Sequence, residues 1–252
     1  MKKVLLISIL ITTYNLVFSQ KNEKSNQEQY SGISIHYSAG KIGIKDYYIS
    51  NQKYSGITNG YNLEWNKNDS NYHKRIEIQY NFSKRLENNN ITGKIDLFSI
   101  NNSYLYPIGS IDIINKELNF YVGPSTNTKI HFRQLNIANG ETNSTANSFL
   151  AVLSGNFNSD LSLSLTNKIT FYFQNNFNLI TIGSKSYDSG KEDEKPLKIL
   201  TPFAGLLFDT KLFMNFQLVK RFSLNLGYYS KFSNINAWDK YVSINDNFLF
   251  LR

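Results

Sequence analysis

Residues 149–165 read FLAVLSGNFNSDLSLSL, and this stretch decides the fold class. One face of the extended chain carries apolar side chains such as Leu153 and Phe157, while the other carries polar ones such as Ser154 and Asp160. Successive side chains of a β-strand point to opposite faces, so alternation with a period of two predicts a strand. No helical stripe of comparable length competes with this pattern.

The same alternation continues on both sides of this stretch, most regularly in residues 169–182 and 222–232. Extended over the chain, it predicts ten strands. They cover residues 31–40, 56–66, 72–83, 92–106, 117–127, 149–165, 169–183, 200–218, 222–232 and 241–251. In the fourth, the apolar residues change face between Leu97 and Phe98, which predicts a β-bulge or a misplaced start.

The predicted connections fall into two classes of length. The long ones are residues 41–55, 84–91, 128–148, 184–199 and 233–240. The others are residues 67–71, 166–168 and 219–221, which are short, and residues 107–116, which are longer. Long loops on one side and short turns on the other are typical of an outer-membrane β-barrel. An even number of strands also returns both chain ends to the periplasm.

The kind of polar residue separates a membrane barrel from a soluble one. A strand surface that faces water usually carries Lys, Glu and Arg. In residues 149–165, 169–183 and 222–232 the polar face is Ser, Asn, Thr, Gln and Gly, with only Asp160 and Lys231 charged. Small neutral groups suit a confined lumen, and a closed barrel leaves no unpaired strand edge in lipid. We therefore predict an all-β fold, an up-and-down antiparallel transmembrane β-barrel of about ten strands.

The start of the chain is typical of an exported protein. Lys2 and Lys3 precede an apolar run over residues 4–11, and Val17 and Ser19 suit cleavage before Gln20. We expect a signal peptide at 1–19, a flexible periplasmic lead-in at 20–29 and the barrel at 30–252. These features predict export to the cell outer membrane of a Gram-negative bacterium.

Composition narrows the function classes. The 252 residues include no cysteine and only three histidines, which leaves little material for a metal site, and we expect no cofactor. The net charge is +8, but the basic residues are scattered rather than gathered in a stripe, so we expect no nucleic-acid partner. A mildly basic surface facing anionic lipid headgroups is the alternative. Outer-membrane lipid is the expected partner, with other outer-membrane or periplasmic proteins as further candidates.

Three features resemble small outer-membrane β-barrel proteins of the Bacteroidota. They are the leader ending in Phe18-Ser19-Gln20, the segment LNFYVGPS at residues 118–125, and the terminal up-and-down hairpins. The composition, rich in Asn, Lys and Ile, fits the same group. The resemblance implies a barrel architecture and no particular chemistry. Such barrels commonly end on an aromatic residue used as an assembly signal, whereas this chain ends FLFLR, with Phe250 two positions early.

Outer-membrane hydrolases, namely omptin-like proteases and lipid-acting enzymes, are the main alternative. They need acid and base groups gathered at the rim or on the lipid-facing wall. His131, expected just outside a strand, could meet acidic residues of the region before and into the eighth strand. These are Asp188, Glu192, Asp193, Glu194 and Asp209. We favour a solvated mixed-charge loop at 191–195, because neither Gly-x-Ser-x-Gly nor His-Glu-x-x-His occurs.

Aromatic residues offer a second alternative. Trp65, Tyr61 and Phe82 lie at or near predicted strand ends, where rings anchor at the headgroup level. Trp238, with Asn236 and Asp239, could instead stack on a sugar, as in a secreted soluble β domain that binds carbohydrate. We favour a non-catalytic integral barrel with a structural, accessory or surface-binding role.

Strand parity predicts a polar cluster in the lumen. If Tyr61 and Trp65 point outward, Glu64 points inward, and the same reasoning places His36, His73 and Arg75 inside. Residues that face each other across a hairpin share a face, so Glu64 can oppose His73 or Arg75. We expect these four residues to form a cluster that stabilises the barrel, because His36, His73 and Arg75 would neutralise Glu64. A His–Glu–His metal site is less favoured, because Arg75 would repel a cation.

The predicted topology can be tested on cells. An epitope tag inserted near Gly140 or Gly190 should be labelled on intact cells, because exposed loop tips outside the membrane tolerate insertion. Antibody binding in flow cytometry measures this, with membrane-permeabilised cells as the control. Labelling that requires permeabilisation would reverse the topology.

Overall fold

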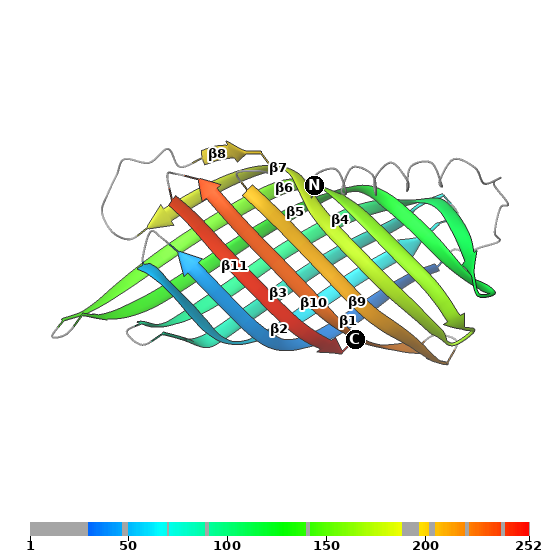
Figure 1. The fold of residues 1–252 in the computed structure, drawn as a ribbon, viewed down its shortest axis with the longest axis horizontal. Helices are drawn as coiled ribbons and strands as arrows, with labels where there is room; N and C mark the ends of the chain where they lie inside the picture. Colours follow the sequence, from blue (N-terminus) through cyan, green and yellow to red (C-terminus); the bar gives the residue numbers. More distant parts are fainter. Residues whose placement is uncertain are drawn as a thin grey trace, which may run out of the picture.

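The computed structural model is all-β and describes residues 30–46, 50–69, 71–88, 91–139, 142–187, 197–201, 205–219, 222–237 and 240–251 (Figure 1). The expected signal peptide (1–19) and lead-in (20–29) lie outside these residues. Within them, no helix is long and apolar enough to cross a membrane.

Ten long strands form a closed antiparallel barrel. They are β1 (Tyr30–Asp46), β2 (Ser50–Asn68), β3 (His73–Asn88), β4 (Ile91–Ile113), β5 (Lys116–Asn139), β6 (Thr142–Thr166), β7 (Ile169–Tyr187), β9 (Gly205–Val219), β10 (Phe222–Ala237) and β11 (Lys240–Leu251). Each pairs with the next along the chain, and β1 pairs with β11 to close the ring. The predicted up-and-down barrel is confirmed.

The eighth predicted strand, 200–218, is wrong as a single strand, because the structure has a short additional strand at its start. That segment belongs to two strands, β8 (Leu197–Leu200) and β9, which pair in turn with the same edge of β7. The buried side chain of Asn178 lies where the ladder is interrupted. Its Oδ1 accepts a hydrogen bond from the Leu207 N–H at 2.7 Å, and its Nδ2 donates to the Gly205 carbonyl. The side-chain amide thus replaces ladder bonds that the backbone does not make.

The strands are much longer than a membrane requires. β4, β5 and β6 contain 23, 24 and 25 residues, whereas about 9–11 suffice to cross a bilayer. Four of the five expected long loops, 41–55, 84–91, 128–148 and 233–240, are therefore largely strand, and most of the fifth, 184–199, lies outside the described residues. β5 continues to Asn139 and β6 begins at Thr142, so strand occupies most of 128–148.

The connection expected at 107–116 is also mostly strand. β4 runs to Ile113 and β5 starts at Lys116, which leaves a two-residue turn. Its residues, Ile114 and Asn115, have φ of 50° and 58°. Two consecutive positive φ values are those of a type I′ turn, which matches the twist of the flanking strands.

The outer surface carries an apolar belt. On β1, Ile33 and Ile35 are each 73% exposed, and the belt continues around the barrel. Other outward members are Leu63, Ile78, Ile100, Leu153, Phe157, Leu212, Met214, Leu226 and Leu249. Polar residues of the same strands point into the lumen. This arrangement fits a barrel wall that faces lipid.

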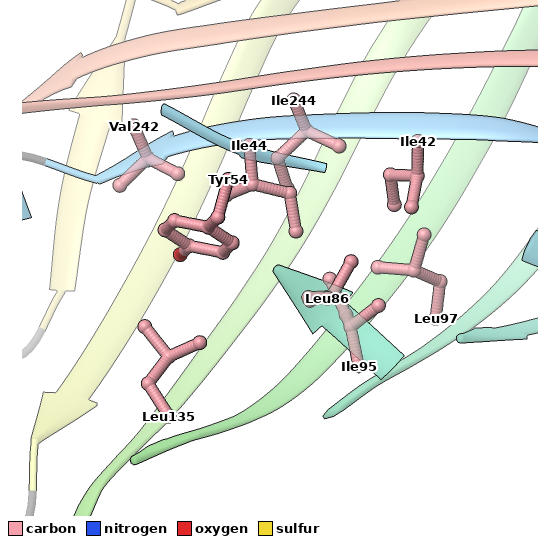
Figure 2. Close-up of a cluster of buried hydrophobic side chains, with 9 residues drawn as sticks. All are labelled: Ile42, Ile44, Tyr54, Leu86, Ile95, Leu97, Leu135, Val242 and Ile244. Atoms are coloured by element: carbon pink, nitrogen blue, oxygen red, sulfur yellow. The ribbon is translucent and has the colours of Figure 1, made fainter. Parts of the chain in front are cut away.

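Towards the end of β1 at Asp46 and the start of β2 at Ser50, the same strands reverse this arrangement. Ile42 and Ile44 of β1 are fully buried and point inward, where they pack with residues of five other strands (Figure 2). That cluster consists of Ile42, Ile44, Tyr54, Leu86, Ile95, Leu97, Leu135, Val242 and Ile244. Outward positions at this level include the exposed polar residues Lys41, Lys53 and Lys94, together with the exposed Ile57, which pairs with Lys41. An apolar interior with a polar exterior is the pattern of a barrel in water.

This reversal explains the change of face in β4. Ile95 and Leu97 point into the apolar cluster, while Ile100 is exposed on the outer belt. The pairing of β4 with β3 and β5 runs through Leu97 and Phe98 without a shift. The bulge predicted there is therefore wrong: the strand leaves lipid for water, and its apolar residues move to the inner face.

Two of the three residues expected to be aromatic anchors, Tyr61 and Phe82, contact each other on the outer surface. The Tyr61 and Phe82 rings stack with centroids 6.4 Å apart. Trp65 is half-buried, and the Lys74 ammonium lies 5.7 Å from its ring centroid. Trp238 and Asp239, proposed for sugar stacking, lie outside the described residues.

The position of the belt can be tested with a charge. Ile78 pairs directly with Leu63 and Ile100, so it lies within the belt. Ile78→Lys should lower the free energy of unfolding by about 2–4 kcal/mol, because a lysine there meets hydrocarbon. Urea unfolding in lipid vesicles measures this. Gln134→Lys, on an outward position beyond the belt, is the control and should change stability little. An equal cost for both would place the belt elsewhere.

Candidate functional site

Below the apolar cluster, the lumen holds a layer of charged side chains. Strand alternation sends Arg75, Glu77, Gln79 and Asn81 of β3 into this layer, and all four are buried. Other strands contribute the remaining buried ionisable residues. These are His36, Glu64, Lys129, His131, Arg133, Asp160, Asp209, Lys211 and Asp246. Buried charges of this kind need partners, and the partners identify how the lumen is built.

One ion pair crosses the whole barrel. Lys211 of β9 donates through Nζ to Glu77 Oε1 of β3. In the ring of ten strands, β3 and β9 are separated by five steps in either direction, so they lie on opposite sides. Asn62 Nδ2 also donates to Glu77 Oε1. Side chains that meet across the ring fill the lumen at this level.

Three further contacts link distant strands in the same layer. Arg75 Nη1 lies 2.9 Å from Asp160 Oδ2, which joins β3 to β6. Lys129 Nζ of β5 donates to both carboxylate oxygens of Asp209 at 3.2 Å. Lys231 of β10 donates to Gln79 Oε1. Together, these contacts form a lattice across the lumen, not a single site.

The structure places the four residues of the predicted cluster differently. Glu64 opposes Glu77, and Arg75 opposes Asn66, so the expected register of Glu64 against His73 or Arg75 is wrong. His36 Nε2 lies 3.9 Å from Glu64 Oε2, which brings those two residues together. Arg75 instead pairs with Asp160.

The fourth residue, His73, lies apart from the other three, at the first position of β3, next to the β2–β3 connection. Its ring is 4.5 Å from that of Tyr121, and its side chain is half-buried. Asp160, Lys211, Lys129 and Asp209 were missed as partners. The alternation of the sequence already placed Asp160 on the inner face of its strand. It does not say which strand lies across the lumen from Asp160, so the partner could not be predicted.

A small cavity lies next to this lattice. It measures about 30 Å³, room for one or two water molecules. Its lining residues are Asn81, Leu97, Phe98, Ser99, Lys129, His131, Lys231, Ser233, Ile244 and Asp246. Asp246 is 1% exposed, and among the described residues its carboxylate oxygens have no hydrogen-bond partner. Water is the ligand that this volume and polarity suit.

The residues proposed for a hydrolase do not meet at a rim in the described part of the chain. His131 lies within β5, not outside it, and is buried in the lumen. Asp209 is engaged by Lys129. Asp188, Glu192, Asp193 and Glu194 lie outside the described residues. Among the residues that are described, no group of three or more His, Asp or Glu side chains could hold a metal ion.

Comparisons with known proteins concern the fold. No protein-family model and no curated protein matches the chain. The outer membrane protease OmpT from Escherichia coli is similar at 6% identity, covering 92% of this chain and 97% of that chain with a TM-score of 0.55. The translocator domain of the autotransporter NalP from Neisseria meningitidis is similar at 9% identity, covering 100% and 96%, with a TM-score of 0.41.

At such identities the likeness shows the fold alone, and we rest it on the OmpT comparison. The closed wall and the exposed apolar belt give the same answer from physical chemistry. The chain is an integral β-barrel of the outer-membrane kind.

The Arg75–Asp160 pair can be measured by a double-mutant cycle. Arg75→Ala should lower the free energy of unfolding by about 3–5 kcal/mol, because Asp160 is left buried without its partner. Adding Asp160→Ala should cost little more. Urea unfolding in vesicles measures all four proteins. The matched control is Glu64→Ala with Arg75→Ala, which should show a smaller coupling. Additive effects for Arg75 and Asp160 would contradict the observed pairing.

Proposed function

We propose that this barrel acts as a non-catalytic structural, accessory or surface-binding protein of the outer membrane. The observation that carries the proposal is the filled lumen. The pair of Lys211 and Glu77 spans the ring, and the apolar cluster around Ile44 and Tyr54 covers it on the side where β1 ends and β2 begins. A lumen filled in this way does not support a diffusion channel.

The long strands support a role outside the membrane. β4, β5 and β6 continue beyond the apolar belt with polar residues on their outer face, including Gln134, Asn136 and Asn147. In the proposed orientation, both chain ends face the periplasm and this extension faces outward. It would present a rigid surface to other molecules at the cell exterior, where a binding or accessory protein needs one.

Origin and export belong to the same proposal. The leader over residues 1–19 and the composition support a protein secreted through a signal peptide in a bacterium of the Bacteroidota. Outer-membrane lipid is the proposed partner, and other outer-membrane or periplasmic proteins are further ones.

Ion conductance tests the sealed lumen. The full mature chain, reconstituted into a planar bilayer, should show no steady conductance, because the charged lattice and the apolar cluster block water. A porin reconstituted in parallel is the positive control. Steady single-channel steps from the folded barrel would contradict the proposal.

Hydrolysis is tested separately on the same preparation. No cleavage of peptides or phospholipids is expected, since His131 is enclosed by the lumen wall. Cleavage that His131→Ala abolishes, in a barrel that keeps its heat-modifiable gel mobility, would favour the hydrolase instead.

A further inference from the structure

The starting observation is an irregularity in β3. Its pairing with β4 shifts between Ser83 and Leu86, and the β2 register against it shifts between Gly56 and Asn59. Lys84 and Arg85 lie at this irregularity, and both are exposed although they are consecutive. In a regular strand one of them would point into the lumen. A bulge of this kind re-aims side chains.

Other cations on adjacent strands surround the two bulge residues. Lys94 of β4 follows Gly93, which pairs with Leu86 just after the bulge. Lys41 of β1 and Lys53 of β2 are exposed on the same outer wall. We call this set the basic ledge. It consists of Lys41, Lys53, Lys84, Arg85 and Lys94.

Two carboxylates with described side chains lie among these cations, and both have partners. Glu87 accepts a bond from Arg85 Nε, yet the Arg85 side chain stays 82% exposed. Asp96 accepts a bond from the Tyr80 hydroxyl at 2.5 Å. The ledge therefore keeps an excess of positive charge.

The ledge lies directly above the lipid-facing belt. Phe82 is two residues before Lys84, and its ring lies 5.6 Å from that of Tyr80 and 6.4 Å from that of Tyr61. These outward rings mark the end of the apolar belt, since aromatic side chains settle at the headgroup level. Cations just beyond them are at the height of lipid phosphates.

The neighbouring strands β5 and β6 carry no such charge in their described positions. The outward residues of β5 and β6 at the corresponding height are exposed, neutral and polar. They are Gln134, Asn136, Thr145 and Asn147, which pair with one another across the two strands. Among the described side chains at this height, the positive charge therefore lies on β1–β4 and does not continue onto β5 and β6.

We propose that the basic ledge binds the phosphate groups of a phosphorylated glycolipid in the outer leaflet. Clusters of Lys and Arg beside a membrane recognise anionic headgroups, and Arg binds phosphate with two parallel hydrogen bonds. Neighbouring strands are about 4.8 Å apart, so cations on four strands spread over about 15 Å. That width exceeds one phosphodiester and suits two phosphates held apart by sugar rings. This inference rests on the proposed outward orientation of the strand extension.

The test measures lipid binding by the purified full chain in nonionic detergent, with native mass spectrometry as the readout. The probes are bisphosphorylated lipid A, dephosphorylated lipid A and phosphatidylglycerol. The variant is Lys84→Gln/Arg85→Gln/Lys94→Gln. The matched control is Lys67→Gln/Lys116→Gln/Lys168→Gln. It removes the same charge at the other end of the barrel, near the β2–β3, β4–β5 and β6–β7 connections.

The wild-type chain should bind bisphosphorylated lipid A at least about tenfold more tightly than either other lipid. The ledge variant should lose that preference, and the control should keep it. Equal binding of dephosphorylated lipid A or of phosphatidylglycerol by the wild-type chain would overturn the inference, as would equal losses in the two variants. The wild-type comparison holds even if the ledge variant does not fold. Because the assay does not depend on orientation, epitope labelling that reversed the topology would overturn the outward placement independently.

Discussion

The constraint on which this structure depends is that no backbone N–H or C=O group can remain unpaired in lipid. An open sheet would expose two strand edges, so the chain must close its last strand onto its first. The pairing of β1 with β11 does this. Where β7 and β9 part, the side chain of Asn178 supplies the missing bonds to Gly205 and Leu207. A single amide there keeps a wall of ten strands continuous.

Closure also decides what each face of a strand must carry, because the wall meets two solvents along its length. Within lipid, apolar side chains point outward and polar ones inward. Beyond it, the same wall stands in water and needs an apolar interior, which Ile42, Leu97 and Ile244 provide. The pairing of β4 with its neighbours runs unshifted through Leu97 and Phe98, where its pattern reverses, and the shift against β3 comes only after Ser83. The reversal of the pattern therefore marks the membrane surface.

Much of this could be predicted from the alternation of the sequence. It predicted the closed ten-strand barrel and the inward faces of Glu64, Arg75 and His36. It did not predict how far the strands extend, because Asn, Ser and Thr suit both loops and strand surfaces that face water. It also did not predict the partner of Arg75. Asp160 lies 85 residues away, and which strand faces β3 across the lumen depends on barrel closure rather than on local pattern.

Ion pairs span the lumen although a buried ion pair often contributes little net stability, so the presence of charges there needs a reason. An apolar lumen would make both faces of every strand apolar within the membrane. Alternation would then vanish, and a slip of one residue would no longer be penalised. With Glu77 and Lys211 inside, a slip of β3 by one residue would turn its charges towards lipid. A pair that joins opposite sides of the ring also constrains β3 and β9 without acting through their neighbours. We infer that the lumen charges select one register and one closure.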